Sequence, residues 1–201
     1  CGEGHFARNL VELTKGNIKI LGVDASENMI RVAKEKSLKF KDHLSFQLSD
    51  ACDLAQIQSH SFDIAVCNMA LMDIKDYTQA IREVSRVLKA KGVFVFSILH
   101  PCFMTPRSDW VKDENHNIIG WKVDDYHLNL AWKWTIKSRM KMETYYFHRT
   151  LEDYFSALRA CGFVVTDIRE PKPSKELFEI KPRLVFNLKR ADFLVVKSVL
   201  L

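Results

Sequence analysis

The sequence lacks any apolar run long enough to cross a membrane, and its first residues do not form a signal peptide. No two cysteines form a C-x-x-C pair, which argues against a zinc site and against a disulfide framework. Internal repeats and low-complexity tracts are also missing. These absences predict a cytoplasmic protein whose thiols are reduced, at Cys1, Cys52, Cys67, Cys102 and Cys161.

A strong excess of one charge is missing as well. The 201 residues carry a formal net charge of only +5, and the densest basic stretch, Lys34 to Lys41, is interrupted by Glu35. A solvated helix face explains such a stretch better than a track for phosphates. The length suits one α/β domain with a sizeable core. We therefore expect a single domain with no nucleic-acid partner.

Helical and strand-like segments alternate along the chain, which predicts a mostly parallel sheet with helices on both faces. The first helix should bury Phe6, Leu10 and Leu13, and the strand over 62–68 should be buried. Thr150 and Asp153 predict a capping box, and Gly92 predicts a helix end. Strands are predicted over 17–24, 44–48, 62–68, 93–99, 163–169 and 193–200. Helices are predicted over 5–15, 27–38, 77–89 and 151–161, with a short segment starting at Pro182.

The alternation stops between Pro101 and Arg149. We interpret residues 101–149 as an aromatic-rich insertion that caps the carboxyl edge of the sheet. Its aromatic side chains either line an apolar acceptor pocket or give the insertion a small core of its own. All four tryptophans lie there, namely Trp110, Trp121, Trp132 and Trp134.

Two glycines, Gly2 and Gly4, lead straight into the first helix, and Asp24 follows Gly4 by twenty residues at the end of the next strand. Glycines let a ligand approach the backbone, and a helix N-terminus presents free N–H groups. A carboxylate at that strand end can accept hydrogen bonds from ribose hydroxyls. The pattern Gly2-x-Gly4-x-x-Ala7 also fits a dinucleotide site, so an NAD-dependent oxidoreductase is an alternative.

Later features separate these two alternatives. Met29 lies five residues beyond Asp24, the pair Asp50-Ala51 follows the next strand, and the segment FDIAVCNMALMDI ends a strand at Asn68. Together with REVSRVLKAKGVFVFSILHPC, these motifs resemble the class I S-adenosylmethionine-dependent methyltransferases, in particular the methyltransferase type 11 family. The resemblance runs from Cys1 to about His100 and resumes at His148.

The resemblance implies a doubly wound, seven-stranded Rossmann-like sheet whose last strand is antiparallel. The first strand of that family should precede Cys1, so we expect a domain over 1–201 that lacks an N-terminal segment of about forty or more residues. Without that strand, its two neighbours would carry unpaired backbone groups.

The resemblance also implies a cofactor, S-adenosyl-L-methionine, with S-adenosyl-L-homocysteine as product. The two glycines would lie under its methionine part, Asp24 would hold the ribose, and Met29 would pack against the adenine. Asp50 and Ala51 would bind the adenine edge, and Asn68 would lie beside the methyl group. The implied cofactor-binding residues are Gly2, Gly4, Asp24, Ala25, Met29, Asp50, Ala51 and Asn68.

Acceptor chemistry is less clearly marked. The sulfonium already activates the methyl group, and a general base helps only where the nucleophile starts protonated. His100, Tyr146 and His148 are the candidate catalytic residues, although a turn or a helix cap explains such residues equally well. We expect methylation of an O or N atom of a small, partly apolar acceptor, with no metal and no membrane partner, by a monomer or homodimer. A non-catalytic S-adenosylmethionine-binding or interaction module is the other alternative.

Overall fold

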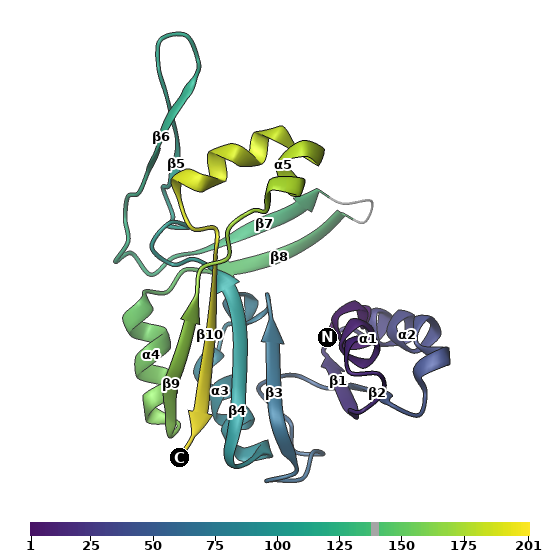
Figure 1. Ribbon diagram of the computed structural model, residues 1–201. Coiled ribbons are helices and arrows are strands. Elements are labelled where there is room, and N and C mark those ends of the chain that lie inside the picture. Colours follow the sequence, from purple (N-terminus) through teal and green to yellow (C-terminus); the bar gives the residue numbers. More distant parts are fainter. Residues whose placement is uncertain (138–140) are drawn as a thin grey trace. The chain divides into compact units, whose positions relative to one another are not determined.

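The computed structural model describes residues 1–137 and 141–201, which form two compact units, residues 1–58 and 59–201 (Figure 1). The side chains of residues 134–143 are not among those described, so the prediction for Trp134 lies outside the described residues. Within the described part of the chain, every helix is too short or too polar to span a membrane.

The first unit is a two-stranded parallel sheet with two helices packed on one face. Its strands pair in register from Ile20 opposite Leu44 to Asp24 opposite Leu48, so both carboxyl ends meet at one edge. The elements are α1 (His5–Leu13), β1 (Ile20–Asp24), α2 (Glu27–Lys36), the 3-10 helix η1 (Leu38–Phe40) and β2 (Leu44–Leu48). The buried core consists of Ala7, Val11, Ile30, Ala33, Leu44 and Phe46.

The buried face of α1 differs from the predicted one. Ala7 and Val11 are buried, whereas Phe6 is 43% and Leu13 is 79% exposed. Ala7 and Val11 are one helical turn apart, and both belong to the buried cluster that also contains Phe46 of β2. The prediction was wrong because it weighted the large apolar residues and left the alanine out.

The second unit contains a four-stranded sheet in the order β3-β4-β10-β9. These strands are β3 (Phe62–Asn68), β4 (Leu88–Leu99), β9 (Phe163–Arg169) and β10 (Phe193–Leu200). Strand β3 is parallel to β4, and β10 is antiparallel to both of its neighbours, which confirms the prediction for the last strand. The connection from β9 holds α5 (Lys175–Ile180) and the 3-10 helix η3 (Pro182–Lys189), and it returns the chain to the same end of the sheet (Figure 1).

The predicted single seven-stranded sheet is not confirmed. Apart from the hairpins of the insertion, the described residues form one sheet of two strands and one sheet of four strands. Helices α3 (Tyr77–Val87) and α4 (Leu151–Ala160) contact each other through Tyr77 and Tyr154 and cover one face of the larger sheet. The prediction that helices cover both faces of one sheet stays a prediction. Strand β3 was predicted to be buried, yet Ile64 is 54% and Val66 is 44% exposed.

Helix α3 ends earlier than predicted. Leu88 already has extended dihedral angles, and Gly92 lies inside β4 rather than at a helix end. The backbone amides of His60 and Ser61 donate to the carbonyls of Arg86 and Val87 at 3.0 and 2.9 Å. These bonds satisfy carbonyls of the last helical turn, so the chain enters the strand without a glycine cap.

The capping box at α4 is confirmed. The Asp153 amide donates to Thr150 Oγ1 at 3.2 Å, and the Thr150 amide donates to Asp153 Oδ2 at 2.7 Å. We expect Thr150→Ala to lower the free energy of unfolding by about 1 kcal/mol in urea titrations, since an amide of the first turn loses its acceptor. The matched variant Thr150→Ser keeps the hydroxyl and should retain most of the stability; equal losses in both variants would contradict the role of the cap.

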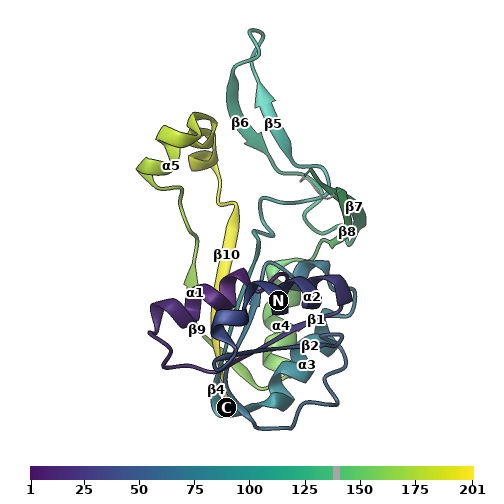
Figure 2. The ribbon, with the colours of Figure 1, turned by 90° about the vertical axis from the view of Figure 1, so that its right-hand side faces the viewer.

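The insertion forms two hairpins, β5 (Asp109–Lys112) with β6 (Ile118–Lys122) and β7 (Ala131–Lys137) with β8 (Lys141–Phe147). Figures 1 and 2 place them, together with α5, beyond the carboxyl ends of β3 and β4. The Trp110 and Trp121 rings meet edge-on at 4.8 Å, and the Arg190 guanidinium lies 3.6 Å from the Trp121 ring centroid. The aromatic residues of the insertion were predicted either to line an acceptor pocket or to form a small core of the insertion. The contacts of Trp110 and Trp121 favour the small core for these two residues.

Candidate functional site

The turn before α1 depends on glycine. Gly2 and Gly4 have φ angles of 55° and 77°, a region that residues with a Cβ rarely adopt. A Cβ on Gly4 would also lie 2.9 Å from Phe46 Cζ. Among the described residues no side chain caps α1, so its first backbone amides face outward without a side-chain partner.

Asp24 at the end of β1 is bonded directly to this turn. Its Oδ2 accepts from the Gly2 backbone amide at 2.7 Å, and its Oδ1 accepts from the Ser26 backbone amide at 2.9 Å. Partial burial raises the pKa of Asp24, hydrogen bonds lower it, and the pKa lies below its ordinary value. The side chain is therefore a carboxylate at neutral pH, and since a carboxylate has about four lone-pair positions, it can accept a further donor.

Asp50 follows β2 at the same edge of the sheet. Leu48 pairs with Asp24, and Asp50 comes two residues later in the turn. Its side chain is exposed, and Oδ1 accepts from the Cys52 amide at 2.8 Å. The two carboxylates of the first unit therefore leave neighbouring parallel strands at their carboxyl ends, as the sequence predicted.

The remaining predicted residues of this unit surround that edge. Ala25 is exposed between β1 and α2, Met29 is half-buried in the first turn of α2, and Ala51 is half-buried after Asp50. The Met29 amide donates to Ser26 Oγ at 3.3 Å, which confirms the predicted start of α2 at Ser26.

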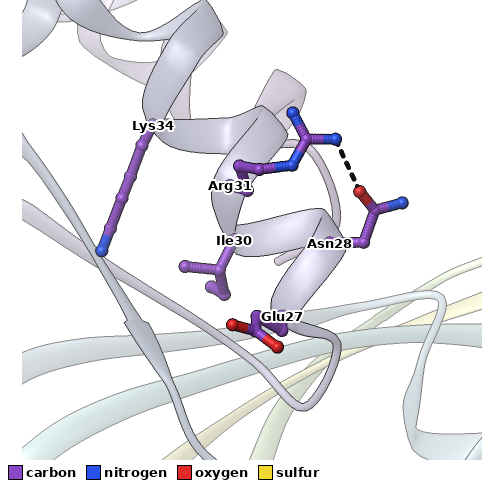
Figure 3. A pocket seen from close by; sticks show the side chains of 5 residues that line it. All are labelled: Glu27, Asn28, Ile30, Arg31 and Lys34. Carbon is purple, nitrogen blue, oxygen red and sulfur yellow. Dashed lines mark hydrogen bonds between the residues drawn. The ribbon is translucent and has the colours of Figure 1, made fainter.

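A hollow of about 490 Å³ lies along α2, and Figure 3 shows its lining. Every lining residue belongs to this helix, and Arg31 donates to Asn28 Oδ1 at 2.8 Å. None of the predicted cofactor-binding residues lines the hollow, so the strand ends are the better candidate site. The lining residues are Glu27, Asn28, Ile30, Arg31 and Lys34.

Asn68 lies at the carboxyl end of β3 in the second unit. Ser97 of β4 pairs with it and donates from Oγ to Asn68 Oδ1 at 2.5 Å. The next residue, Met69, has a φ of 51°, which is strained for a side chain of this size, and its amide donates to Ser97 O at 3.0 Å. The loop after β3 is thus fixed to β4 in a strained conformation, a feature that is frequent at functional sites.

Asp73 ends the short 3-10 helix η2 (Leu71–Asp73) in the same loop. The carboxyl group is half-buried, and no residue in the described part of the chain forms a hydrogen bond or ion pair with it. Burial raises its pKa to about 6. No role was predicted for this residue, although a single carboxylate within the apolar segment Leu71-Met72-Asp73-Ile74 was a signal that could have identified it.

Arg149 holds this loop. Its buried guanidinium donates to the carbonyls of Leu71, Ile74 and Lys75 at 3.3, 2.6 and 3.0 Å. The same group lies 4.1 Å from the centroid of the Tyr77 ring. The arginine therefore fixes the backbone on both sides of Asp73.

His100 lies directly after β4, as predicted, and is buried. The Cys102 amide donates to Nδ1 at 3.2 Å, so Nε2 carries the hydrogen and donates to Glu170 Oε1 at 2.9 Å. Burial lowers the pKa of His100 more than the Glu170 carboxylate raises it. The imidazole is therefore neutral at neutral pH, and both of its nitrogens are engaged.

Tyr146 and His148 come from the end of β8 and the residues after it, and both are buried. The Tyr146 hydroxyl donates to Met104 O at 3.3 Å, and burial raises its pKa, so it is a poor proton acceptor. His148 donates from Nε2 to Tyr126 O at 2.8 Å, while Nδ1 has no partner among the described residues. His148 lines a hollow of about 320 Å³ with Tyr77, Asn129, Leu130, Ala131, Phe147, Arg149 and Asp153.

Two sets of predicted residues therefore come together. Gly2, Asp24 and Asp50 share one edge of the first sheet, and Asn68 and His100 share the carboxyl edge of the second. Among the residues with described positions, no three histidine, cysteine or acidic side chains are grouped so that they could hold a metal ion.

A family model for a methyltransferase domain matches residues 1–149. Over 95 residues the chain is 33% identical to the demethylmenaquinone methyltransferase of Staphylococcus aureus, a match that spans 47% of this chain and only 39% of that enzyme. Two solved structures are similar over nearly the whole chain. One is a proposed S-adenosylmethionine-dependent methyltransferase from Listeria monocytogenes, with a TM-score of 0.83, 27% identity, and coverage of 100% of this chain and 87% of that one. The other is an S-adenosylmethionine-dependent methyltransferase from Mesorhizobium loti, with a TM-score of 0.80, 28% identity, and coverage of 99% and 87%.

These matches agree with the motifs at the strand ends. The family model covers well over half of the chain, and the two solved structures share its Rossmann-like α/β fold. The match to a methyltransferase domain favours methyl transfer over the NAD-dependent alternative. The chain belongs to the class I S-adenosylmethionine-dependent methyltransferases, a family whose cofactor is S-adenosylmethionine.

Proposed function

We propose that this protein transfers the methyl group of S-adenosylmethionine to an O or N atom of a small, partly apolar acceptor. The observation that carries the proposal is the bond between the Gly2 amide and the Asp24 carboxylate, with Asp50 at the end of the neighbouring strand. The glycine turn and the first amides of α1 suit the carboxylate of a methionine moiety. The two aspartates suit the ribose hydroxyls and the adenine amino group.

The residues of the first unit bind and orient the cofactor in this proposal. Asp24 is ionised and accepts hydroxyl hydrogens, Met29 offers a half-buried apolar surface to the adenine, and Ala51 offers its backbone to a ring nitrogen. When bound, S-adenosylmethionine supplies a methyl group that needs no further activation. The remaining task of the chain is to place the nucleophile in line and to exclude water.

The candidate residues for acceptor binding belong to residues 59–201. Asn68 is the residue assigned to the neighbourhood of the methyl group, and the insertion over 101–149 is the segment assigned to acceptor recognition. Of the three catalytic candidates, His100 has both nitrogens engaged and Tyr146 is held neutral, whereas His148 keeps an unpartnered Nδ1. His148 is therefore the member of this set best able to accept a hydrogen bond from a ligand.

A small, partly apolar acceptor is supported by the relative from Staphylococcus aureus, whose substrate is demethylmenaquinone. The hollow beside His148 adds to this support, since Leu130, Ala131 and Phe147 contribute apolar side chains to its lining. Apolar pockets with a few polar groups are typical of such sites.

Calorimetry tests the cofactor assignment directly. We expect heat and saturable binding on titration with S-adenosylhomocysteine and none with NADH. Binding of NADH alone would contradict methyl transfer. Binding of S-adenosylhomocysteine without transfer of a labelled methyl group to any acceptor in a broad panel would favour a non-catalytic binding module.

A further inference from the structure

We infer that Asp73 accepts the proton of the methyl acceptor, and that the acceptor presents a hydroxyl or amino group to this carboxylate. The inference rests on the proposed function and extends it, because it names a reacting residue and the chemistry of the acceptor. Carbon nucleophiles that carry no O–H or N–H group lie outside this class.

The position of Asp73 is the first argument. It lies five residues after Asn68, in the loop that leaves the carboxyl end of β3. In open α/β sheets ligands bind at the carboxyl ends of the strands. Helix η2, which Asp73 ends, packs against β4 and against β8 of the insertion. Asp73 therefore lies between the strand end assigned to the methyl group and the segment assigned to acceptor recognition.

The missing partner is the second argument. A half-buried carboxylate without a hydrogen bond or an ion pair in the described part of the chain is unfavourable, and perturbed carboxylates of this kind cluster at functional sites. Within the described residues, the titratable side chains whose ionisation responds to Asp73 are Cys67 of β3 and Tyr146 of β8. Burial keeps both of them neutral, with the pKa of Cys67 raised to about 11. No described cation compensates the charge on Asp73.

The rigid backbone around Asp73 is the third argument. Met69 is strained and bonded to Ser97 on one side, and Arg149 binds the carbonyls of Leu71, Ile74 and Lys75 around Asp73 itself. A general base must be held in a fixed place relative to the nucleophile. Arg149 is thus a positioning residue, because it fixes the loop through backbone carbonyls and leaves the Asp73 carboxylate free.

The proton and electron balance of the step is complete. A lone pair on the acceptor oxygen or nitrogen forms the bond to the methyl carbon as the carbon–sulfur bond breaks and its electrons stay on sulfur. The O–H or N–H proton passes to the Asp73 carboxylate, which later releases it to solvent. Since burial sets the pKa of Asp73 at about 6, the residue is ionised and able to accept a proton at pH 7.5.

Kinetics with three probes test the inference: 4-tert-butylcatechol, phenethylamine and 1-methylindole, with products identified by mass spectrometry. We expect methylation of the catechol or the amine. Asp73→Asn should lower kcat about 100-fold, a loss typical of a missing general base. The wild-type kcat should fall below about pH 6, and the variant should lack this acid limb. The matched control Asp63→Asn, on the exposed part of β3, should behave as wild type.

Several outcomes would overturn the inference: an unchanged kcat in Asp73→Asn, methylation of 1-methylindole alone, or no turnover of the catechol and the amine. A large loss in His148→Gln combined with normal turnover by Asp73→Asn would assign the proton to His148 instead. Calorimetry with S-adenosylhomocysteine distinguishes failure of the inference about Asp73 from failure of the proposed function. If Asp73→Asn binds it as wild type does, only the inference is at stake, whereas failure of the wild type to bind it would remove the proposed function.

Discussion

Replacing Asp24 with alanine is expected to weaken the binding of S-adenosylhomocysteine about 100-fold, because hydrogen bonds to a charged acceptor contribute about 1.5 to 3 kcal/mol each. The carboxylate is ionised and is bonded to the glycine turn through the Gly2 amide at 2.7 Å. Its loss therefore removes the acceptor for the ribose and also loosens the turn that the methionine part would contact. Isothermal calorimetry at pH 7.5 measures the change.

Two variants show whether the effect is specific. Asp42→Ala removes an exposed carboxylate near the amino end of β2 and should bind as wild type does. Asp50→Ala removes one hydrogen bond from the adenine edge and should weaken binding about tenfold. A dissociation constant of folded Asp24→Ala within threefold of the wild-type value would exclude the strand-end site, and circular dichroism establishes that the variant is folded.

Four of the strands could be predicted well because their signals are local. The predicted bounds of β2, β3, β9 and β10 match the structure, since each is a short apolar run set between polar or turn residues. The α4 capping box was predicted for the same reason, because Thr150 and Asp153 are three residues apart. Candidate residues at strand ends followed from this, since the carboxyl ends of parallel strands meet at one edge.

Contacts between distant residues could not be predicted in this way. His100 meets Glu170 seventy residues away, and Arg149 reaches carbonyls more than seventy residues earlier in the chain. No local pattern encodes either pairing. The prediction of the buried face of α1 failed for a related reason. That face depends on which side chains of α2 and β2 pack against Ala7 and Val11, and not on hydrophobicity along the helix alone.

Asp73 has one feature that the local sequence predicts and one that depends on distant residues. Its place after β3 follows from the sequence, but its lack of a partner depends on everything that packs around it. The same isolation that suits it to accept a proton also makes the folded protein less stable, as is common for residues that serve catalysis. The proposed role and the stability of the fold can therefore be measured on one variant.

Asp73→Asn is expected to raise the free energy of unfolding by about 2 kcal/mol at pH 7.5. A pKa shift of this size corresponds to about 3 kcal/mol at about 1.4 kcal/mol per unit, and solvent screening of the half-buried carboxylate reduces that figure. Burial raises the pKa of Asp73 from 3.8 to about 6, so the folded protein binds this proton more tightly than the unfolded chain does. The wild type should consequently lose stability as the pH rises from about 4 to about 6, and the deficit should persist above that range. Asparagine has nearly the same size and carries no charge, so the variant avoids the deficit.

Urea titrations between pH 4 and pH 8 measure this difference. The gain in Asp73→Asn should be absent near pH 4, where the wild-type carboxyl is protonated, and complete by about pH 7. Asp63→Asn is the matched control: its carboxylate is largely exposed and pairs with Lys89 at 2.8 Å, so its effect should be small. Equal stability of Asp73→Asn and wild type at pH 7.5 would show that the carboxylate has a partner in solution, and the strongest reason for assigning it a ligand would be lost.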